Sequence, residues 1–293
     1  MFFHDKRLQY YTKPEKSDPL LARRVQELLG GQFGEMSVMM QYLFHGWACR
    51  GPEKYRDMLL DIGTEEIAHV EMLATMVTHL LEGAPIEEQE KAASHPIVGA
   101  IMGGGTATEA VMAGMDPQHY ICTGLAASPN DSNGFPWTAR YIVASGNLMA
   151  DFRANLAAES QGRLQVARVW QTTDDAGVRD TFAFMLARDT MHQNQWAAAI
   201  EDLMQSGLET DLVVPGTFPR EKQMNEYAYQ FWDLSKPGNE SGQGRWASGT
   251  APDGKGKFEY LADPQPLGPA AQPDQVSPLT YGTPAKPVPP IST

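Results

Sequence analysis

Small and apolar side chains recur along residues 18–206 at alternating spacings of three and four, the period of amphipathic helices that pack against one another. Asp18 and Pro19 mark the first helix start, because aspartate caps free backbone N–H groups and proline fits the first turn. Glycine and proline interrupt the pattern near residues 51 and 83, and "TTDD" at 172–175 is a turn whose acids suit the next helix start. The pattern predicts four long helices with these core-facing rows: Val25, Leu28, Gln32, Glu35, Met39, Tyr42 and Gly46; Leu59, Ile62, Glu66, His69, Leu73, Met76 and Leu80; Leu148, Phe152, Asn155, Glu159, Gly162, Val166 and Val169; and Val178, Phe182, Met185, Asp189, His192, Trp196, Ala199 and Leu203.

The four predicted helices form two hairpins, separated by a long connection over residues 84–137 that is rich in glycine, proline and asparagine. Two hairpins joined by one long crossover are the topology of a ferritin-like four-helix bundle. Core-facing positions that alternate between spacings of three and four residues suit the shallow crossing angles between the helices of such a bundle. The sequence therefore predicts an all-α fold, in which an N-terminal segment over residues 1–17 precedes a bundle over residues 18–206.

The remaining residues, 207–293, carry 13 of the 21 prolines and one helical candidate, "PREKQMNEYAYQFWDLS" at 219–235. This composition predicts an extended C-terminal arm. Two interpretations of the arm stay open, a partly disordered tail and a segment that wraps a neighbouring subunit. The second is favoured by aromatic side chains that prefer burial, namely Trp232, Trp246, Phe258 and Tyr260.

Ionisable residues interrupt all four core-facing rows. A buried carboxylate must be paired, neutralised or bound to metal, and few lysines or arginines occur in these rows. Glu66 and His69 stand three residues apart, hence on one helix face, and Asp189 and His192 repeat the spacing. A glutamate from each of two helices and an acid-x-x-His from each of the other two is the di-metal carboxylate arrangement. The rows therefore predict a metal centre built from Glu35, Glu66, His69, Glu159, Asp189 and His192.

A satisfied structural contact is the alternative for either acid–histidine pair taken alone. Glu65 also competes with Glu66, because it precedes His69 by four residues, which is another helical neighbour spacing. The periodicity places Glu66 in the core-facing row. Glu65 and Glu71 are therefore expected on the solvated side of the helix.

Charge and cysteine content narrow the functional classes. The formal net charge of −13 at pH 7 disfavours nucleic acid and anionic membranes, whose binding needs clustered basic residues. The 2 cysteines, Cys49 and Cys122, do not form a Cys-x-x-Cys motif or any Cys/His spacing of a metal site. So few cysteines are typical of a protein in a reducing compartment. The first residues do not resemble a secretory signal, and no apolar run is long enough to span a membrane. We therefore expect a cytoplasmic protein with no nucleic-acid or membrane partner.

Several segments of the chain resemble the manganese (non-haem) catalases, a ferritin-like family, over roughly residues 1–260. They are "MFFHDKRLQY", "GGQFGEMSVMMQY", "DIGTEEIAHVEML", "NLAAESQGRL" and "RDTMHQNQWAAAIEDL". The resemblance implies that Glu66 is the carboxylate that bridges two manganese ions. The full ligand set that it implies is Glu35, Glu66, His69, Glu159 and His192.

Other positions match residues that the family places near the metals. Asp189 stands where some members carry a glutamate outside the ligand set, and Glu159, Asp189 or a bridging water are candidates for relaying protons. Tyr42 matches an outer-sphere tyrosine, with a core aromatic as the alternative. Ala158 departs from the pattern, because some members place an arginine directly before the glutamate at this point, so an arginine-gated access is not expected here.

The resemblance implies a dimanganese catalase, a hydrogen-peroxide oxidoreductase that disproportionates hydrogen peroxide to water and oxygen by cycling between Mn(II)2 and Mn(III)2. It also implies a homohexamer. Two alternatives stay open, a di-iron oxidase or ferroxidase on the same bundle, and a structural relative such as a spore-coat protein. The complete set of ligand-type residues argues against the structural relative.

A second metal site is implied more faintly. Asp57 and Asp61 share one helix face, and some family members bind calcium with carboxylates at these positions and an Asn-x-Ser segment from the C-terminal region. "GNESGQG" supplies Asn239 and Ser241 here. The alternative is a solvated acidic face.

Overall fold

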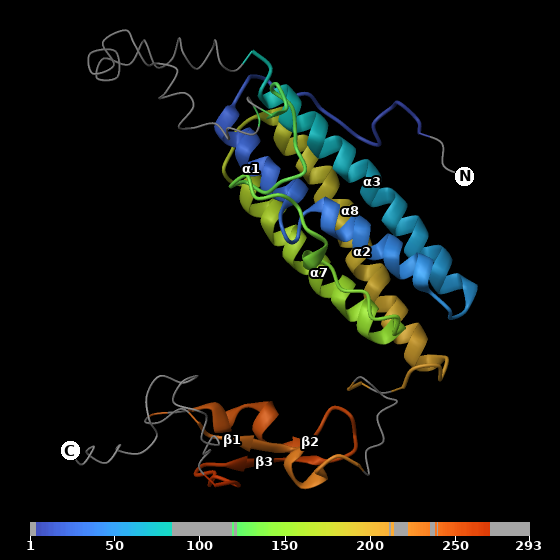
Figure 1. Cartoon of the computed structure of the whole chain (residues 1–293), viewed down its shortest axis with the longest axis vertical. Coiled ribbons are helices and arrows are strands. Elements are labelled where there is room, and N and C mark those ends of the chain that lie inside the picture. Colours follow the sequence, from blue (N-terminus) through green and yellow to red (C-terminus); the bar gives the residue numbers. More distant parts are fainter. Residues whose placement is uncertain are drawn as a thin grey trace, which may run out of the picture. The chain divides into compact units, whose positions relative to one another are not determined.

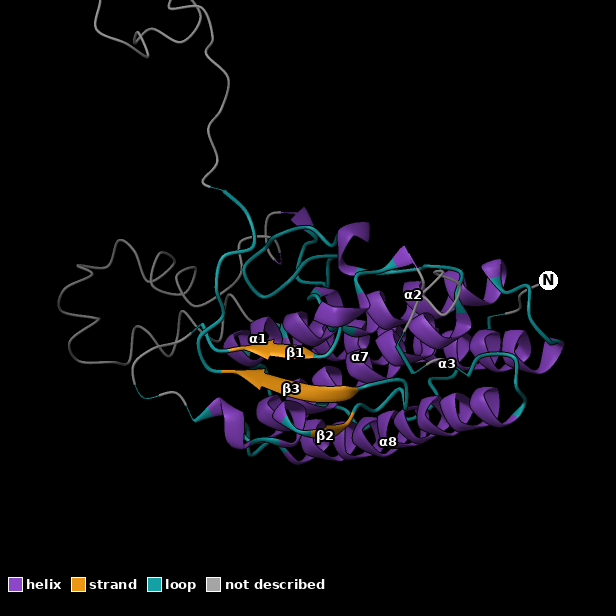
Figure 2. Cartoon of the chain, turned by 90° about the horizontal axis from the view of Figure 1, so that it is seen from below, coloured by secondary structure: helices purple, strands orange, loops and turns teal. Residues whose placement is uncertain are grey.

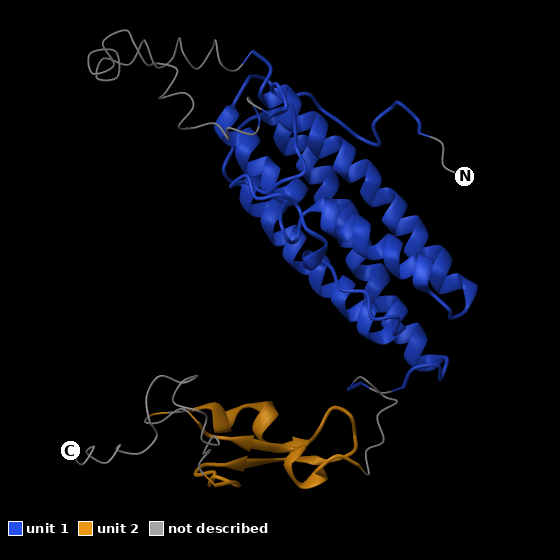
Figure 3. Cartoon of the chain, viewed as in Figure 1, with its two compact units in different colours: residues 1–217 blue, residues 218–293 orange. Residues whose placement is uncertain are grey.

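The computed structural model describes residues 4–83, 119, 122–210, 212–213, 222–234, 238 and 240–269. The chain divides into two compact units, residues 1–217 and 218–293, which are described separately (Figure 3). The first unit holds a bundle of long helices (Figure 1), and the predicted ferritin-like bundle is confirmed. Its helices are α1 (Pro19–Gly30), α2 (Glu35–Ala48), α3 (Glu53–Leu80), α7 (Leu148–Trp170) and α8 (Ala176–Gln205), and a 3-10 turn covers Ala139–Tyr141.

Short polar side chains fix where three of these helices begin. The side chain of Asp18 accepts a hydrogen bond from the N–H of Leu21, so α1 begins where the Asp-Pro pair predicted. Asn147 caps α7 in the same way, and Asp175, the last residue of the "TTDD" turn, caps α8.

The first predicted helix is divided in two, contrary to the continuous row that the sequence indicated. Residues 31–34 separate α1 from α2, and Gln32, which was expected in the core-facing row, is exposed. Gly31 and Gly34 both adopt extended backbone, and a Cβ at either position would crowd the carbonyl oxygens of the last turn of α1. The break makes Glu35 the first residue of α2.

Two apolar clusters fill the bundle and lie on either side of a polar layer. On α3, Ile62 belongs to one cluster and Met72 to the other, with Glu66 and His69 between them. The helix α8 repeats this order in reverse, with its polar residues between two apolar stretches. The largest fully buried side chains include Trp196, Tyr42, Phe152, Phe182, Leu73 and Met76.

The C-terminal unit contains strands that the sequence did not predict. Its three-stranded sheet has the order β1 (Gln230–Trp232), β3 (Lys257–Leu261), β2 (Gly249–Thr250), shown in orange in Figure 2. The first pair is parallel, with Phe231 opposite Tyr260, and the second pair is antiparallel. The helical candidate at 219–235 is wrong in its described part, which holds a 3-10 turn and β1. The 3-10 turns of this unit are Asn225–Tyr227, Ser241–Gln243 and Arg245–Ala247.

The described part of the N-terminal segment, residues 4–17, is fastened to both α3 and α8. The Tyr11 hydroxyl lies 2.6 Å from Nδ1 of His79, and the N–H of Thr12 donates to Thr181 Oγ1. Lys13 crosses the first turn of α8 so closely that Gly177 has no room for a side chain. Among the described residues, no helix is both long and apolar enough to cross a membrane.

We predict that Gly177→Ala destabilises the protein, against the usual trend. Alanine within a helix ordinarily gains up to about 1 kcal/mol over glycine. Here the added methyl group would collide with the carbonyl oxygen of Lys13, and overpacking of this kind costs about 1–3 kcal/mol. Thermal or urea unfolding of the metal-free protein measures the change.

The matched control is Ala176→Gly, because Ala176 is the exposed neighbour on the same turn. It should lose no more than about 1 kcal/mol through helix propensity alone. A Gly177→Ala protein as stable as the wild type would mean that the N-terminal segment does not pack against α8.

Candidate metal centre

The polar layer gathers the six residues that the sequence singled out. Glu35 comes from the start of α2, while Glu66 and His69 come from adjacent turns of α3. The opposite hairpin supplies Glu159 from α7 and an acid-x-x-His pair from α8. All six side chains are buried, with at most 6% of each residue exposed: Glu35, Glu66, His69, Glu159, Asp189 and His192.

Glu66 stands between the two imidazoles. Its Oε2 lies 2.7 Å from Nδ1 of His69, and its Oε1 lies 2.7 Å from Nδ1 of His192. The two rings are stacked, with centroids 5.6 Å apart. A single carboxylate therefore presents one oxygen to each histidine.

The other carboxylates surround the two Nδ1 atoms. Glu35 Oε2 lies 3.6 Å and Asp189 Oδ1 lies 3.8 Å from Nδ1 of His69. Glu159 Oε1 lies 3.7 Å from Nδ1 of His192. Three overlapping sets of donors are close enough to hold an ion, namely Glu66, His69 and His192; Glu35, His69 and Asp189; and Glu159, Asp189 and His192.

Several donor atoms of this layer have no hydrogen-bond partner among the described residues. They are both oxygens of Glu66, both ring nitrogens of His69, and Nδ1 of His192. Buried polar atoms are normally satisfied, so a group of orphaned oxygen and nitrogen donors at one place indicates a ligand. Carboxylate and imidazole donors suit manganese or iron, so these residues fit a transition-metal centre.

Without metal, burial raises the pKa values of the carboxyl groups. It raises the pKa of Glu35 to about 8, with the charge of Glu66 adding to the shift, and the pKa of Glu159 lies well above its usual range for the same reasons. Burial raises the pKa of Asp189 to about 7, against the opposing effect of His69. The layer therefore favours protonated carboxyl groups until cations replace the protons.

For the two imidazoles and Glu66, neighbouring charges outweigh burial, raise the pKa values of His69 and His192, and lower the pKa of Glu66, so that the charged forms are favoured. Burial lowers the pKa of His192, but the carboxylates of Glu65 and Glu66 outweigh burial and raise it to about 10. Burial raises the pKa of Glu66, yet the charges of His69 and His192 outweigh this effect and leave the pKa below its usual range. Glu66 is therefore the carboxylate of the layer that stays ionised between two imidazolium rings.

Tyr42 joins the centre through Glu159. Its hydroxyl donates a 2.7 Å hydrogen bond to Glu159 Oε1, and the residue is fully buried. Its ring packs against Trp196, with centroids 4.9 Å apart. Tyr42 thus combines the two roles that the sequence left open, since it is both a core aromatic and a neighbour of the candidate ligands. Ala158 is also buried, beside Glu159.

Glu65 is a neighbour of the polar layer that the sequence reasoning missed. It was expected on the solvated side, but its side chain is only 18% exposed and its Oε2 accepts a 3.0 Å hydrogen bond from Nε2 of His192. Arg188 also donates to it twice. The signal available in the sequence was the spacing of four residues before each histidine, Glu65 before His69 and Arg188 before His192.

The residues predicted for calcium are divided between the two compact units. Asp57 and Asp61 are exposed on α3, and Asp57 forms an ion pair with Arg56 at 3.1 Å. Asn239 lies outside the described residues, and Ser241 belongs to the C-terminal unit.

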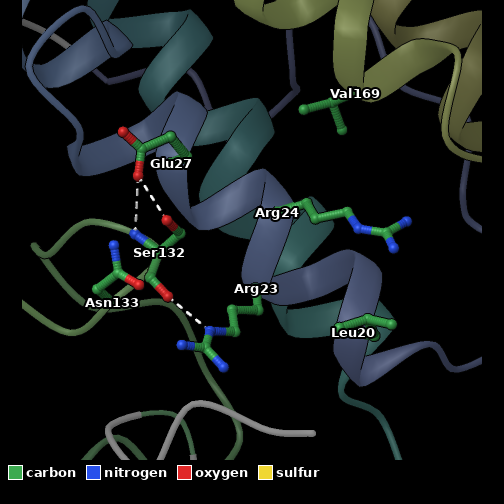
Figure 4. A pocket seen from close by; sticks show the side chains of 7 residues that line it. All are labelled: Leu20, Arg23, Arg24, Glu27, Ser132, Asn133 and Val169. Atoms are coloured by element: carbon green, nitrogen blue, oxygen red, sulfur yellow. Dashed lines mark hydrogen bonds between the residues drawn. The ribbon is translucent and has the colours of Figure 1, made fainter.

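A surface pocket of about 370 Å³ lies over α1, and none of the six buried residues lines it. Figure 4 shows that Arg23 and Glu27 are directed at Ser132. Arg23 Nε donates to the carbonyl of Ser132, and Glu27 accepts from the N–H and hydroxyl of Ser132. The polar layer, rather than this pocket, is therefore the candidate functional site.

Comparison with known proteins agrees with the geometry. The family described as "Manganese containing catalase" matches residues 1–292. The chain belongs to the manganese catalase family. The family predicted from the sequence, and with it the assignment as a manganese-dependent catalase, is confirmed.

Individual manganese catalases and their relatives match nearly the whole chain. A manganese catalase of Bacillus subtilis is 52% identical over 97% of this chain and 98% of its own length. The uncharacterized protein YjqC of Bacillus subtilis strain 168 is 55% identical over 93% of each chain. The crystal structure of KatB, a manganese catalase from Anabaena PCC7120, covers 90% of this chain and 100% of its own with a TM-score of 0.67, and at 24% identity it supports the fold alone.

We predict that Mn²⁺ uptake by the metal-free protein releases protons. Glu35 with its pKa of about 8 and His192 with its pKa of about 10 hold protons at neutral pH, and metal ligands must give them up. The apparent affinity for Mn²⁺ should therefore rise between about pH 6 and about pH 8. Titration with Mn²⁺ in weakly buffered solution containing a pH indicator measures the release.

The control for this titration is His192→Ala, which should release fewer protons because one titrating ligand is missing. An affinity that does not change over this pH range would contradict the raised pKa values.

Proposed function

We propose that the polar layer holds two manganese ions per chain, with Glu35, Glu66, His69, Glu159 and His192 as their ligands. The observation that carries this proposal is the position of Glu66, whose two oxygens each lie 2.7 Å from Nδ1 of a different imidazole. A carboxylate so placed suits a bridge between two ions. The orphaned buried donors around it support the same assignment.

A bound manganese pair would supply two-electron exchange with hydrogen peroxide, alternating between Mn(II)2 and Mn(III)2, so that one peroxide becomes water and another becomes oxygen. The chain's own residues must handle the accompanying protons. Asp189 is suited to this task, because its carboxyl group is buried in the layer and its Oδ1 lies 3.8 Å from Nδ1 of His69.

Glu159 and Tyr42 complete the proposed catalytic set. The hydroxyl of Tyr42 fixes Glu159 Oε1 through a 2.7 Å hydrogen bond, which leaves the other carboxylate oxygen for a metal or a proton. The aromatic rings around Tyr42 keep this side of the layer apolar. The proposed roles are proton handling for Glu159 and Asp189, and orientation of Glu159 for Tyr42.

We expect the purified protein to contain about two manganese ions per chain and to release oxygen from hydrogen peroxide in the presence of azide. Elemental analysis and oxygen measurement on the same sample test both points. Two iron ions without oxygen release would support the di-iron oxidase instead. Absence of transition metal after loading would favour the structural relative.

The variant Asp189→Asn distinguishes, in the same assay, between two roles of Asp189, proton transfer and metal binding. The amide keeps the size of the side chain but cannot exchange the proton, so oxygen release should fall about 10²- to 10⁴-fold while manganese content is retained. Loss of manganese would instead make Asp189 a ligand. Asp180→Asn, an exposed acid on the same helix, is the matched control and should leave both measurements unchanged.

The assembly proposed for this catalase is a cytoplasmic homohexamer. Phe44 and Trp47 on α2 support association, because they are 43% and 62% exposed and form an apolar pair on the surface. The two free cysteines described, Cys49 and Cys122, suit a reducing compartment.

The proposed calcium site uses Asp57 and Asp61, whose side chains stand on one exposed face of α3, together with Asn239 and Ser241. We expect calcium removal to shift the homohexamer toward smaller species on size-exclusion chromatography. Asp57→Ala should behave like the calcium-depleted protein. Unchanged calcium content in that variant would exclude the site, and Glu53→Ala, an exposed acid of the first turn, serves as control.

A further inference from the structure

The two candidate ligand imidazoles each present a second nitrogen on the side away from the metal centre. Their Nδ1 atoms face Glu66, so their Nε2 atoms point outward. Glu65 meets them there. Its Oε2 accepts a 3.0 Å hydrogen bond from Nε2 of His192, and its Oε1 lies 4.0 Å from Nε2 of His69. One carboxylate thus faces the outer edge of both rings.

Glu65 is itself held from two directions. Arg188 donates from Nε to Oε1 at 2.6 Å and from Nη2 to Oε2 at 3.0 Å, so the guanidinium forms a hydrogen bond with each carboxylate oxygen. Gln9, in the N-terminal segment, donates from Nε2 to Oε1 at 2.8 Å. The position of this carboxylate is therefore fixed by α8 and by the segment that crosses α3 and α8.

Glu65 and Arg188 occupy equivalent positions on their two helices. On α3, Glu65 precedes His69 by one turn, and on α8, Arg188 precedes His192 by one turn. The arginine–glutamate pair therefore lies directly outside the pair of histidines. A bidentate ion pair at this point joins the two hairpins where the metal centre joins them on the inside.

We propose that Glu65 is a positioning residue of the metal centre, which orients His192 through the hydrogen bond to its Nε2, places a negative charge 4.0 Å from Nε2 of His69, and is held in place by Arg188 and Gln9. A carboxylate that accepts from Nε2 keeps the proton on that nitrogen, so Nδ1 is left free to bind a metal. This inference rests on the metal centre proposed above.

A purely structural ion pair is the alternative. Such a pair between partly exposed groups contributes at most about 1 kcal/mol to folding, and its loss would not alter how a folded protein binds metal. The affinity for Mn²⁺ and the spectrum of the bound ions therefore distinguish the two roles.

The test compares Glu65→Ala, Glu65→Gln and Glu71→Gln with the wild type. Each metal-free protein is titrated with Mn²⁺ in competition with a chelator, and the loaded form is examined by low-temperature electron paramagnetic resonance. Glu71→Gln is the matched control, because Glu71 is on the same helix and also bonds to the N-terminal segment, through His4 at 2.9 Å. Glu65→Gln covers the case in which the alanine variant fails to fold, since its amide oxygen still accepts from His192.

We expect Glu65→Ala to weaken Mn²⁺ binding by about 10- to 100-fold, the usual effect of removing a partner of a ligand histidine. Glu65→Gln should lose less Mn²⁺ affinity than Glu65→Ala. Its electron paramagnetic resonance spectrum should still change, because the amide lacks the negative charge that pairs with Arg188. Glu71→Gln should keep the affinity and the spectrum of the wild type. Gln9→Ala should lose less affinity than Glu65→Ala, because it removes only one of the three bonds that hold the carboxylate.

Wild-type affinity and an unchanged spectrum in a folded Glu65→Ala or Glu65→Gln protein would overturn the inference. The same effect in Glu71→Gln would overturn it too, because the change would then come from the N-terminal segment. A wild type that binds no Mn²⁺ would instead refute the proposed metal centre, so the two failures are distinguishable.

Discussion

Four carboxyl groups and two imidazoles share one layer of the bundle, and such a layer is unfavourable unless cations balance its charge. The apolar clusters on either side exclude water, which is why burial raises the pKa values of Glu35, Asp189 and Glu159. Metal binding and packing of this region are therefore coupled. The same apolar clusters that stabilise the bundle make the polar layer depend on a ligand.

The polar layer depends on how the two hairpins are paired. Each hairpin supplies one helix with an acid-x-x-His pair and one with a single glutamate, so neither hairpin holds the complete set. The break at residues 31–34 places Glu35 at the start of α2, where free N–H groups and the helix dipole favour a carboxylate. The centre thus requires both hairpins to be in register.

The helices and the six buried residues could be predicted from sequence, because helical periodicity and polar interruptions of it are local signals. The break before Glu35 could not, since Gln32 and Glu35 keep the three-residue spacing across it. Glu65 was misjudged because its partner, Arg188, lies 123 residues away in the chain. The sheet of the C-terminal unit rests on strands of 2 to 5 residues, too short to show a period.

The pairing of Glu65 with Arg188 also resolves an electrostatic conflict. The three proposed ligand carboxylates would nearly balance two divalent ions, so another carboxylate beside the histidines would make the proposed centre more negative and favour its oxidised state. Arg188 is bonded to both oxygens of Glu65 and carries the opposite charge. The pair can therefore orient the imidazoles while adding no net charge, which explains why an arginine, rather than a second neutral donor, stands opposite Glu65.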